Sequence, residues 1–168
     1  MVATRPPGVM DGHPSFMGLY VGMSLAEVGA LYEMPADWSQ RLCRHPTSKD
    51  RYLTCHVYVS GTGLGKRLGI PFELLRFTVA HDAGSTTATF IMATVTFDDP
   101  TKALRLYRTI VERWQEAGTQ LELSHTAPPY SREEFCAQAA SIPGEANGTR
   151  VRLSCILQEF RVEVALTN

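Results

Sequence analysis

Apolar and polar residues alternate along several stretches of the chain, as is typical of β-strands with one buried face. The stretches 51–59, 72–81 and 86–97 predict three strands, and the short turn between the last two predicts a hairpin. Alternation returns over 149–157 and 159–166, where it predicts a strand pair near the C-terminus. Strands of this kind, combined with helices, indicate an α+β fold built on an antiparallel sheet.

Two short helices are predicted by capping boxes, in which a serine and a glutamate three residues later satisfy the first backbone groups of the helix. Ser24 and Glu27 form the first box, and its helix is expected to end before Pro35. Ser131 and Glu134 form the second box. The two boxes indicate two helix-plus-sheet halves of similar design.

A single long helix is predicted over 100–117, where apolar residues recur at helical spacing. Asp99 can cap its start, and Gly118 can end it. Its apolar stripe consists of Ala103, Leu104, Tyr107, Ile110, Val111 and Trp114. A short strand is expected after it, at about 120–124. The predicted sheet is thus packed by one long helix and two short ones.

The remaining segments are expected to be irregular. Residues 1–15 hold three prolines and little apolar content, which predicts a flexible N-terminal arm. A single α+β domain then covers residues 16–168, and it can be divided into the two halves. Residues 35–50 are interpreted as a polar loop, and 142–148 as a connection with an Asn-Gly turn at its end.

The chain has four cysteines, which fall into two local pairs, Cys43 with Cys55 and Cys136 with Cys155. Of the three possible connectivities, this local one is the simplest. Each bridge would contribute about 3 kcal/mol by restricting the unfolded chain. Two disulfides imply an oxidising compartment, whereas four free thiols would fit a cytoplasmic protein.

Charge and hydropathy exclude some classes of function. Lysine and arginine number 16 against 17 aspartate and glutamate, so the sequence indicates no general attraction to nucleic acid or anionic membranes. No apolar run approaches the roughly 18 residues that span a bilayer. Residues 1–14 lack the apolar core of a signal peptide. Together with the cysteines, we expect a periplasmic or secreted protein whose leader is absent, or alternatively a cytoplasmic one.

The glycine-rich segment 60–71 invites comparison with a phosphate-binding loop. That loop requires a glycine five residues before Gly65 and a serine or threonine after Lys66, and this chain has Ser60 and Arg67 instead. We therefore expect a flexible surface loop. Lys66 and Arg67 at its tip remain candidates for contact with an acidic partner.

Cys43, His45 and Cys55 could supply three ligands to zinc, while the adjacent His56 points to the opposite face of its strand. We favour the disulfide over this metal site. His81 and its neighbouring aspartate are interpreted as part of a solvated hairpin turn. No motif places a nucleophile or an acid–base pair, so we expect no catalytic residue, cofactor or metal.

Tyr52, His56 and Tyr58 share the non-core face of the strand at 51–59. An exposed face rich in tyrosine suits a protein interface, because tyrosine is enriched among residues that dominate binding energy. The alternative is that the long helix covers this face and makes these residues part of the core. Both readings stay open from the sequence.

Residues 18–34, "GLYVGMSLAEVGALYEM", resemble the start of the superfamily of small outer-membrane assembly lipoproteins and β-lactamase inhibitor proteins. Gly22, Met23, Ser24 and Val28 match its Gly-Met-Ser/Thr-x-x-x-Val pattern, and a cysteine pair spaced like 43 and 55 follows the helices in the inhibitor. The chain departs from the family in having no second such motif, a long helix at 100–117, and no glycine at the end of the first helix. The resemblance implies a non-catalytic, protein-binding, extracytoplasmic module.

These observations favour a protein that binds another protein and is not an enzyme. An inhibitor or immunity protein that neutralises a toxin or effector enzyme by occlusion fits best. An envelope assembly factor or a secretion-system chaperone, which could dimerise, comes next. The rival class is a small cytoplasmic enzyme or ligand-binding domain with a pocket between helix and sheet.

Overall fold

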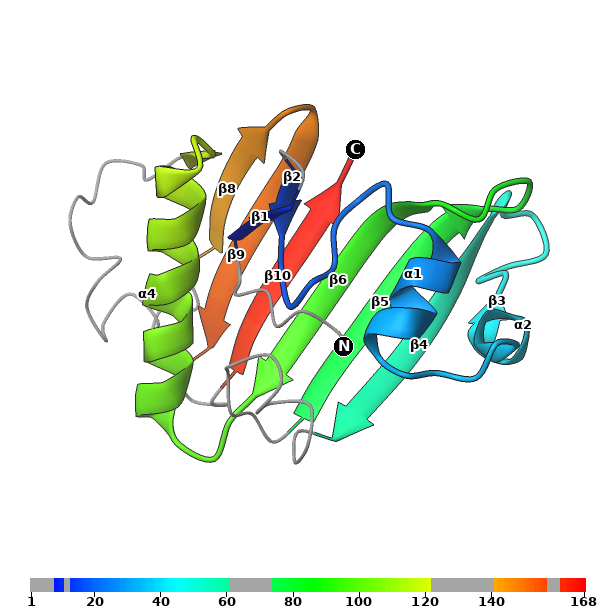
Figure 1. The fold of residues 1–168 in the computed structure, drawn as a ribbon, viewed down its shortest axis with the longest axis horizontal. Coiled ribbons are helices and arrows are strands. Elements are labelled where there is room, and N and C mark those ends of the chain that lie inside the picture. Colours follow the sequence, from blue (N-terminus) through cyan, green and yellow to red (C-terminus); the bar gives the residue numbers. More distant parts are fainter. Residues whose placement is uncertain (1–7, 11–12, 61–73, 122–140, 157–160) are drawn as a thin grey trace.

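The computed structural model describes residues 8–10, 13–60, 74–121, 141–156 and 161–168 (Figure 1). Within these stretches, the main sheet has eight antiparallel strands in the order β3-β4-β5-β6-β10-β9-β8-β7. The strands are β3 (Cys43–Arg44), β4 (Tyr52–Ser60), β5 (Leu74–Asp82), β6 (Ala88–Thr96), β7 (Gln120–Leu121), β8 (Ser141–Ala146), β9 (Thr149–Ile156) and β10 (Arg161–Thr167). The predicted α+β class and its antiparallel sheet are confirmed.

The strand order is symmetric about the middle of the sheet. The first half of the chain supplies β3 to β6 from one edge inward, and the second half supplies β7 to β10 from the other edge inward. The last strand of each half pairs with the other, so that Val162 lies opposite Val95 and Val164 opposite Ala93. The halves therefore share one continuous sheet and one core.

Three helices of the described part lie on one face of the sheet, as Figure 1 shows: α1 (Leu25–Leu31), α2 (Trp38–Leu42) and α4 (Pro100–Glu116). The capping box of α1 is present, with the backbone nitrogen of Glu27 donating to Ser24 Oγ at 3.1 Å. Asp99 caps α4 by accepting a hydrogen bond from the backbone nitrogen of Lys102 at 3.1 Å. Both predicted helix starts are confirmed. No helix in these stretches is long and apolar enough to cross a membrane.

The segment 35–50 is not a loop throughout, because it contains α2 and β3. Trp38 begins α2 and is buried, and its indole Nε1 donates to the carbonyl oxygen of Leu25 at 3.1 Å. Gly29 makes room for it, since a Cβ atom there would lie 2.6 Å from that nitrogen. The expectation failed because α2 is only five residues long and Trp38 is buried by contact with α1, so the segment 35–50 shows no periodic pattern of its own.

The segment 142–148 is also mostly a strand, β8, where an irregular connection was expected. The Asn-Gly turn at its end is confirmed: Asn147 and Gly148 have φ angles of +50° and +78° and link β8 to β9. Two consecutive positive φ angles characterise the tight hairpin turn for which this pair is preferred. Pro143 and Gly144 hid the strand from a pattern-based prediction, because both residues are rare in strands.

Within the segment predicted to be a flexible arm, β1 (Gly8–Met10) pairs with β2 (His13–Ser15). Ser15 is buried, and its carbonyl oxygen accepts a hydrogen bond from Trp114 Nε1 of α4 at 3.2 Å. The chain then turns at Met17 and Gly18, both with positive φ, and runs over the sheet between α4 and α1 (Figure 1).

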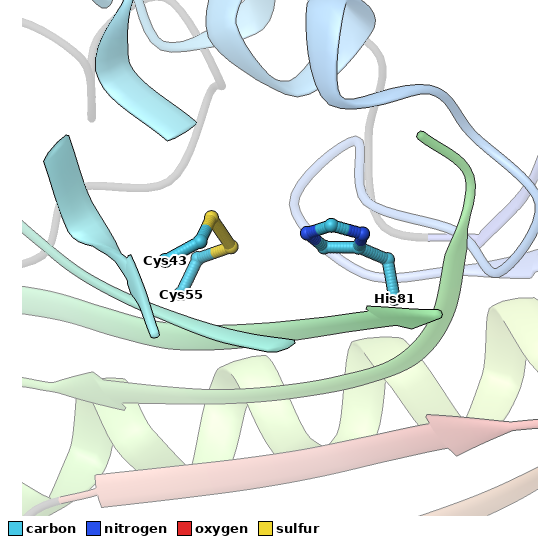
Figure 2. Close-up of side chains that lie close together, drawn as sticks. All are labelled: Cys43, Cys55 and His81. Carbon is cyan, nitrogen blue, oxygen red and sulfur yellow. A yellow bond between two sulfur atoms is a disulfide. The ribbon is translucent and has the colours of Figure 1, made fainter. Parts of the chain in front are cut away.

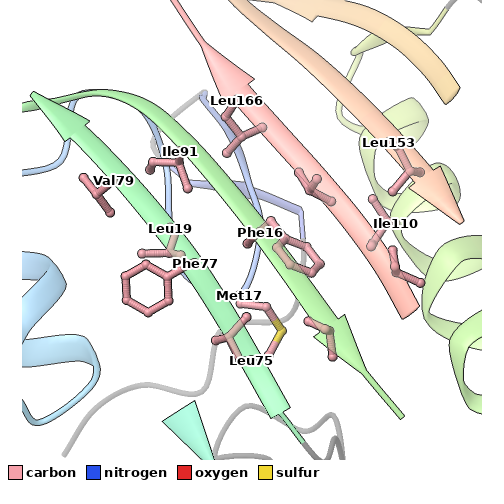
Figure 3. Close-up of a cluster of buried hydrophobic side chains, with 14 of the residues drawn as sticks. Phe16, Met17, Leu19, Leu75, Phe77, Val79, Ile91, Ile110, Leu153 and Leu166 are labelled. Atoms are coloured by element: carbon pink, nitrogen blue, oxygen red, sulfur yellow. The ribbon is translucent and has the colours of Figure 1, made fainter. Parts of the chain in front are cut away.

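One hydrophobic core lies between the sheet and this covering layer (Figure 3). It takes Phe16 and Leu19 from the N-terminal turn, Phe77 from β5, Ile110 from α4 and Leu153 from β9, all with at most 1% of their surface exposed. The apolar stripe predicted for the long helix is buried in the same core. The second predicted short helix, at Ser131, lies outside the described residues.

Candidate binding surface

The sheet face opposite the helices is open: no helix or strand among the described residues covers it. Successive side chains of a strand point to opposite faces, so half of every strand's residues belong to this side. On β5, Leu75, Phe77 and Val79 are fully buried, whereas Arg76 between them is exposed. We call this side the open face.

The aromatic candidates of β4 lie on the open face. Tyr58 is 66% exposed and Tyr52 41% exposed, and His56 between them is also exposed. His56 is held by a hydrogen bond between its Nδ1 and Thr78 Oγ1 on β5, at 2.9 Å. Of the two readings left open by the sequence, exposure is the observed one, because the long helix packs on the other side of the sheet.

Charged and polar side chains extend this strip across the sheet. Register places Tyr58 opposite Arg76, then Thr94 on β6, and then Glu163 on β10. Thr94 Oγ1 donates to Glu163 Oε2 at 3.3 Å, which links the two central strands on this face. The open face therefore offers tyrosine rings beside an exposed arginine, whereas Thr94 is buried and Glu163 is half-buried.

The other end of the open face holds a groove of about 900 Å³. One register row crosses it, formed by Phe90, Thr167, Arg150, Glu145 and Gln120 of five successive strands. Ala117 and Gly118, which directly follow α4, also line the groove. The open face thus has exposed aromatic residues on β4 and a groove that contains arginine at its other end.

The sequence did not single out Arg76, Arg150 or the nearby Arg152, although all three lie exposed on the open face. The alternation of apolar and polar residues does place each of these arginines on the polar face of its strand. This pattern did not show that the arginines are exposed, because alternation indicates which residues share a face but not which face the helices cover. Lys66 and Arg67, the other basic candidates, lie outside the described residues.

The disulfide predicted between Cys43 and Cys55 is present, and it joins β3 to β4 beside the end of α2. The second predicted pair includes Cys136, which lies outside the described residues; its predicted partner Cys155 is buried on the covered side. His45, proposed from the sequence as a zinc ligand beside Cys43 and Cys55, is exposed instead, with its Nδ1 at 3.1 Å from the carbonyl oxygen of Tyr52.

His81 is not part of a solvated turn, which corrects that interpretation. It is only 7% exposed, because β5 continues to Asp82 and places His81 on the same face as Leu75 and Val79. Its ring lies beside the disulfide of Cys43 and Cys55 (Figure 2).

No protein-family model, curated protein or solved structure matches this chain. The surface itself is therefore the basis for a proposal about function.

Proposed function

We propose that this protein binds another protein through the open face, and that it acts as an inhibitor or immunity protein by covering a functional surface of a toxic enzyme. The observation that carries the proposal is the position of the three described helices on one side of the sheet, which leaves Tyr52, His56 and Tyr58 exposed on the other.

The chemistry of this face supports a protein partner. Tyrosine supplies a large contact area at low cost in conformational entropy and is enriched among interface residues that dominate affinity. Tyr58 and Tyr52 lie on the same face of one strand, and Arg76 stands directly opposite Tyr58. Exposed tyrosine rings at one end of the open face and a groove at the other suit a partner with a protruding loop, which the groove can receive.

The compartment that we propose is extracytoplasmic. A disulfide between Cys43 and Cys55 is stable where the surroundings are oxidising. We further propose a second bridge between Cys136 and Cys155, and membership of the superfamily that residues 18–34 resemble. The proposed kinship rests on the sequence pattern of residues 18–34, whose predicted capped helix is α1.

The proposal can be tested by replacing Tyr58 with a photo-crosslinking amino acid and exposing the protein to the secreted and periplasmic fraction of its source. Arg105 of α4, exposed on the opposite side of the molecule, is the matched control position. We expect one dominant crosslinked protein from position 58 and none from position 105. The purified partner should lose its activity when this protein is bound.

Tyr52→Ala combined with Tyr58→Ala should then weaken binding by at least tenfold, since truncation of an interface tyrosine often costs more than 1 kcal/mol. Equal crosslinking from positions 58 and 105 would remove the open face from the proposal. A partner that binds at the open face but keeps its full activity would contradict inhibition and favour an assembly factor or a chaperone.

A further inference from the structure

The disulfide of Cys43 and Cys55 forms a compact cluster with His81 on the covered side of the sheet (Figure 2). One ring nitrogen and the two Sγ atoms all lie within 4.8 Å of one another. All three residues are buried, with 6%, 0% and 7% of their surface exposed. The group therefore combines two sulfurs and an imidazole in a site largely closed to solvent.

Strand register brings these three residues together. Cys43 of β3 lies directly opposite Cys55 of β4. His81 of β5 lies opposite Leu53, two residues before Cys55, so that His81 and Cys55 are diagonal neighbours on the same face. Side chains at diagonal positions of neighbouring strands are within reach of each other.

The hydrogen bonds of His81 determine which nitrogen is available. Its Nδ1 lies 2.9 Å from the carbonyl oxygen of Asp82 and 2.8 Å from that of Ser85. A carbonyl oxygen only accepts, so Nδ1 carries the hydrogen and the neutral ring has its lone pair on Nε2. Nε2 is buried and has no hydrogen-bond partner among the described residues. Figure 2 shows the ring edge away from Cβ turned toward the two sulfurs.

We propose that the reduced form of this cluster is a metal site for a thiophilic divalent cation, with zinc as the reference ion. A dithiol reductant transfers two electrons and two protons to the disulfide and is itself oxidised to a disulfide. The S–S bond breaks and leaves Cys43 and Cys55 as thiols. Zinc then displaces both thiol protons to solvent and is bound by two thiolates and the Nε2 lone pair of His81.

The residues present fit this ion. Two cysteine thiolates and one histidine are a known three-ligand zinc set, with water in the fourth position. Bonds of about 2.0–2.3 Å in a tetrahedral arrangement separate the ligand atoms by less than about 4 Å, so only small movements are required. In a metal-bound histidine, the N–H of the other ring nitrogen usually donates a hydrogen bond to a carbonyl or carboxylate oxygen. Nδ1 of His81 has such carbonyl partners in Asp82 and Ser85.

The cluster lies on the opposite side of the sheet from the open face, so this inference does not rest on the proposed function. Its consequence is that β3 and β4 can be held together in two ways, by a disulfide under oxidising conditions and by a metal ion under reducing ones. Metal and disulfide exclude each other, because both require the same two sulfurs.

The test measures protection of individual cysteines. The protein is reduced in denaturant, freed of reductant without oxygen, and refolded with one equivalent of zinc or, as a control, magnesium. Alkylation rates of Cys43 and Cys55 are then read by peptide mass spectrometry, which separates them from the other two cysteines. We expect zinc to slow alkylation of both at least tenfold and magnesium to have no effect.

Two variants locate the third ligand. His81→Asn should lose most of the protection, whereas His45→Asn should keep it. In the unsubstituted zinc form, the ¹⁵N chemical shift of His81 Nε2 should move to the range of a metal-bound nitrogen, which decides the matter if His81→Asn does not refold. The proposal is overturned if zinc gives no protection, if the reduced chain stays unfolded with zinc, or if the Nε2 shift does not move.

Discussion

The two faces of the sheet use the same strands for opposite purposes. On β5, the fully buried Phe77 lies next to the exposed Arg76, and on β4 the buried Val57 lies next to Tyr58, which is 66% exposed. Both faces share one backbone and one set of ladder hydrogen bonds. The difference therefore teaches that the covered face carries most of the folding energy, while residues on the open face can be chosen for contact with a partner.

The largest expected contrast comes from truncating one aromatic residue on each face. Phe77→Ala removes a fully buried ring and leaves a cavity, so we expect a loss of about 3–5 kcal/mol in the free energy of unfolding. Tyr58→Ala on the adjacent strand should cost less than about 1 kcal/mol, because most of this residue's surface is already exposed. Denaturant unfolding followed by circular dichroism measures both, and similar losses would contradict the division between the faces.

A buried and an exposed tyrosine hydroxyl are expected to differ by an intermediate amount in how they affect the pH dependence of stability. Burial raises the pKa of Tyr32 well above the usual range of tyrosine, and its hydroxyl donates to the carbonyl oxygen of Met17 at 2.7 Å. In the unfolded chain the Tyr32 hydroxyl ionises near pH 10, whereas in the folded protein it keeps its proton at that pH. The stability that Tyr32 contributes is thus complete below pH 10 and is lost progressively as pH rises further.

Tyr32→Phe should lower stability by about 1 kcal/mol at pH 7 by removing this hydrogen bond, and should make the alkaline loss of stability less steep. Tyr58→Phe, on the open face, is the matched control and should leave the curve unchanged. Unfolding free energies measured between pH 8 and pH 11.5 test this. An unaltered alkaline slope in Tyr32→Phe would show that its ionisation does not drive the loss.

The smallest expected contrast concerns carboxylates. Asp99→Ala removes the cap of α4, which covers the core, and should cost about 1 kcal/mol. Asp82→Ala removes an exposed carboxylate at the end of β5 and should change stability by less than about 0.5 kcal/mol. Thermal unfolding of the two variants side by side provides the measurement. Equal shifts in melting temperature would mean that the cap contributes nothing measurable.

Much of the fold was predictable because its signals are local. The capping box at Ser24, the long helix that begins after Asp99, and the strands β4, β5 and β6 all depend on residues close together in the chain. The short helix at Trp38 and the strand β8 were missed for the opposite reason. Trp38 is held in place by Gly29 and Leu25, and β8 by pairing with β9 across the turn at Asn147.

The candidate sites show the same division between features that are predictable from local sequence and features that depend on packing. The amino-acid pattern alone was enough to predict that Tyr52, His56 and Tyr58 share one face and that Cys43 could pair with Cys55, because alternation and cysteine spacing are properties of the chain. The folded structure was needed to show that the helices cover the other face and that His81, rather than His45, lies beside the disulfide. The physical reason is that burial and diagonal contacts depend on which elements pack together, and a strand with two plausible faces does not carry that information.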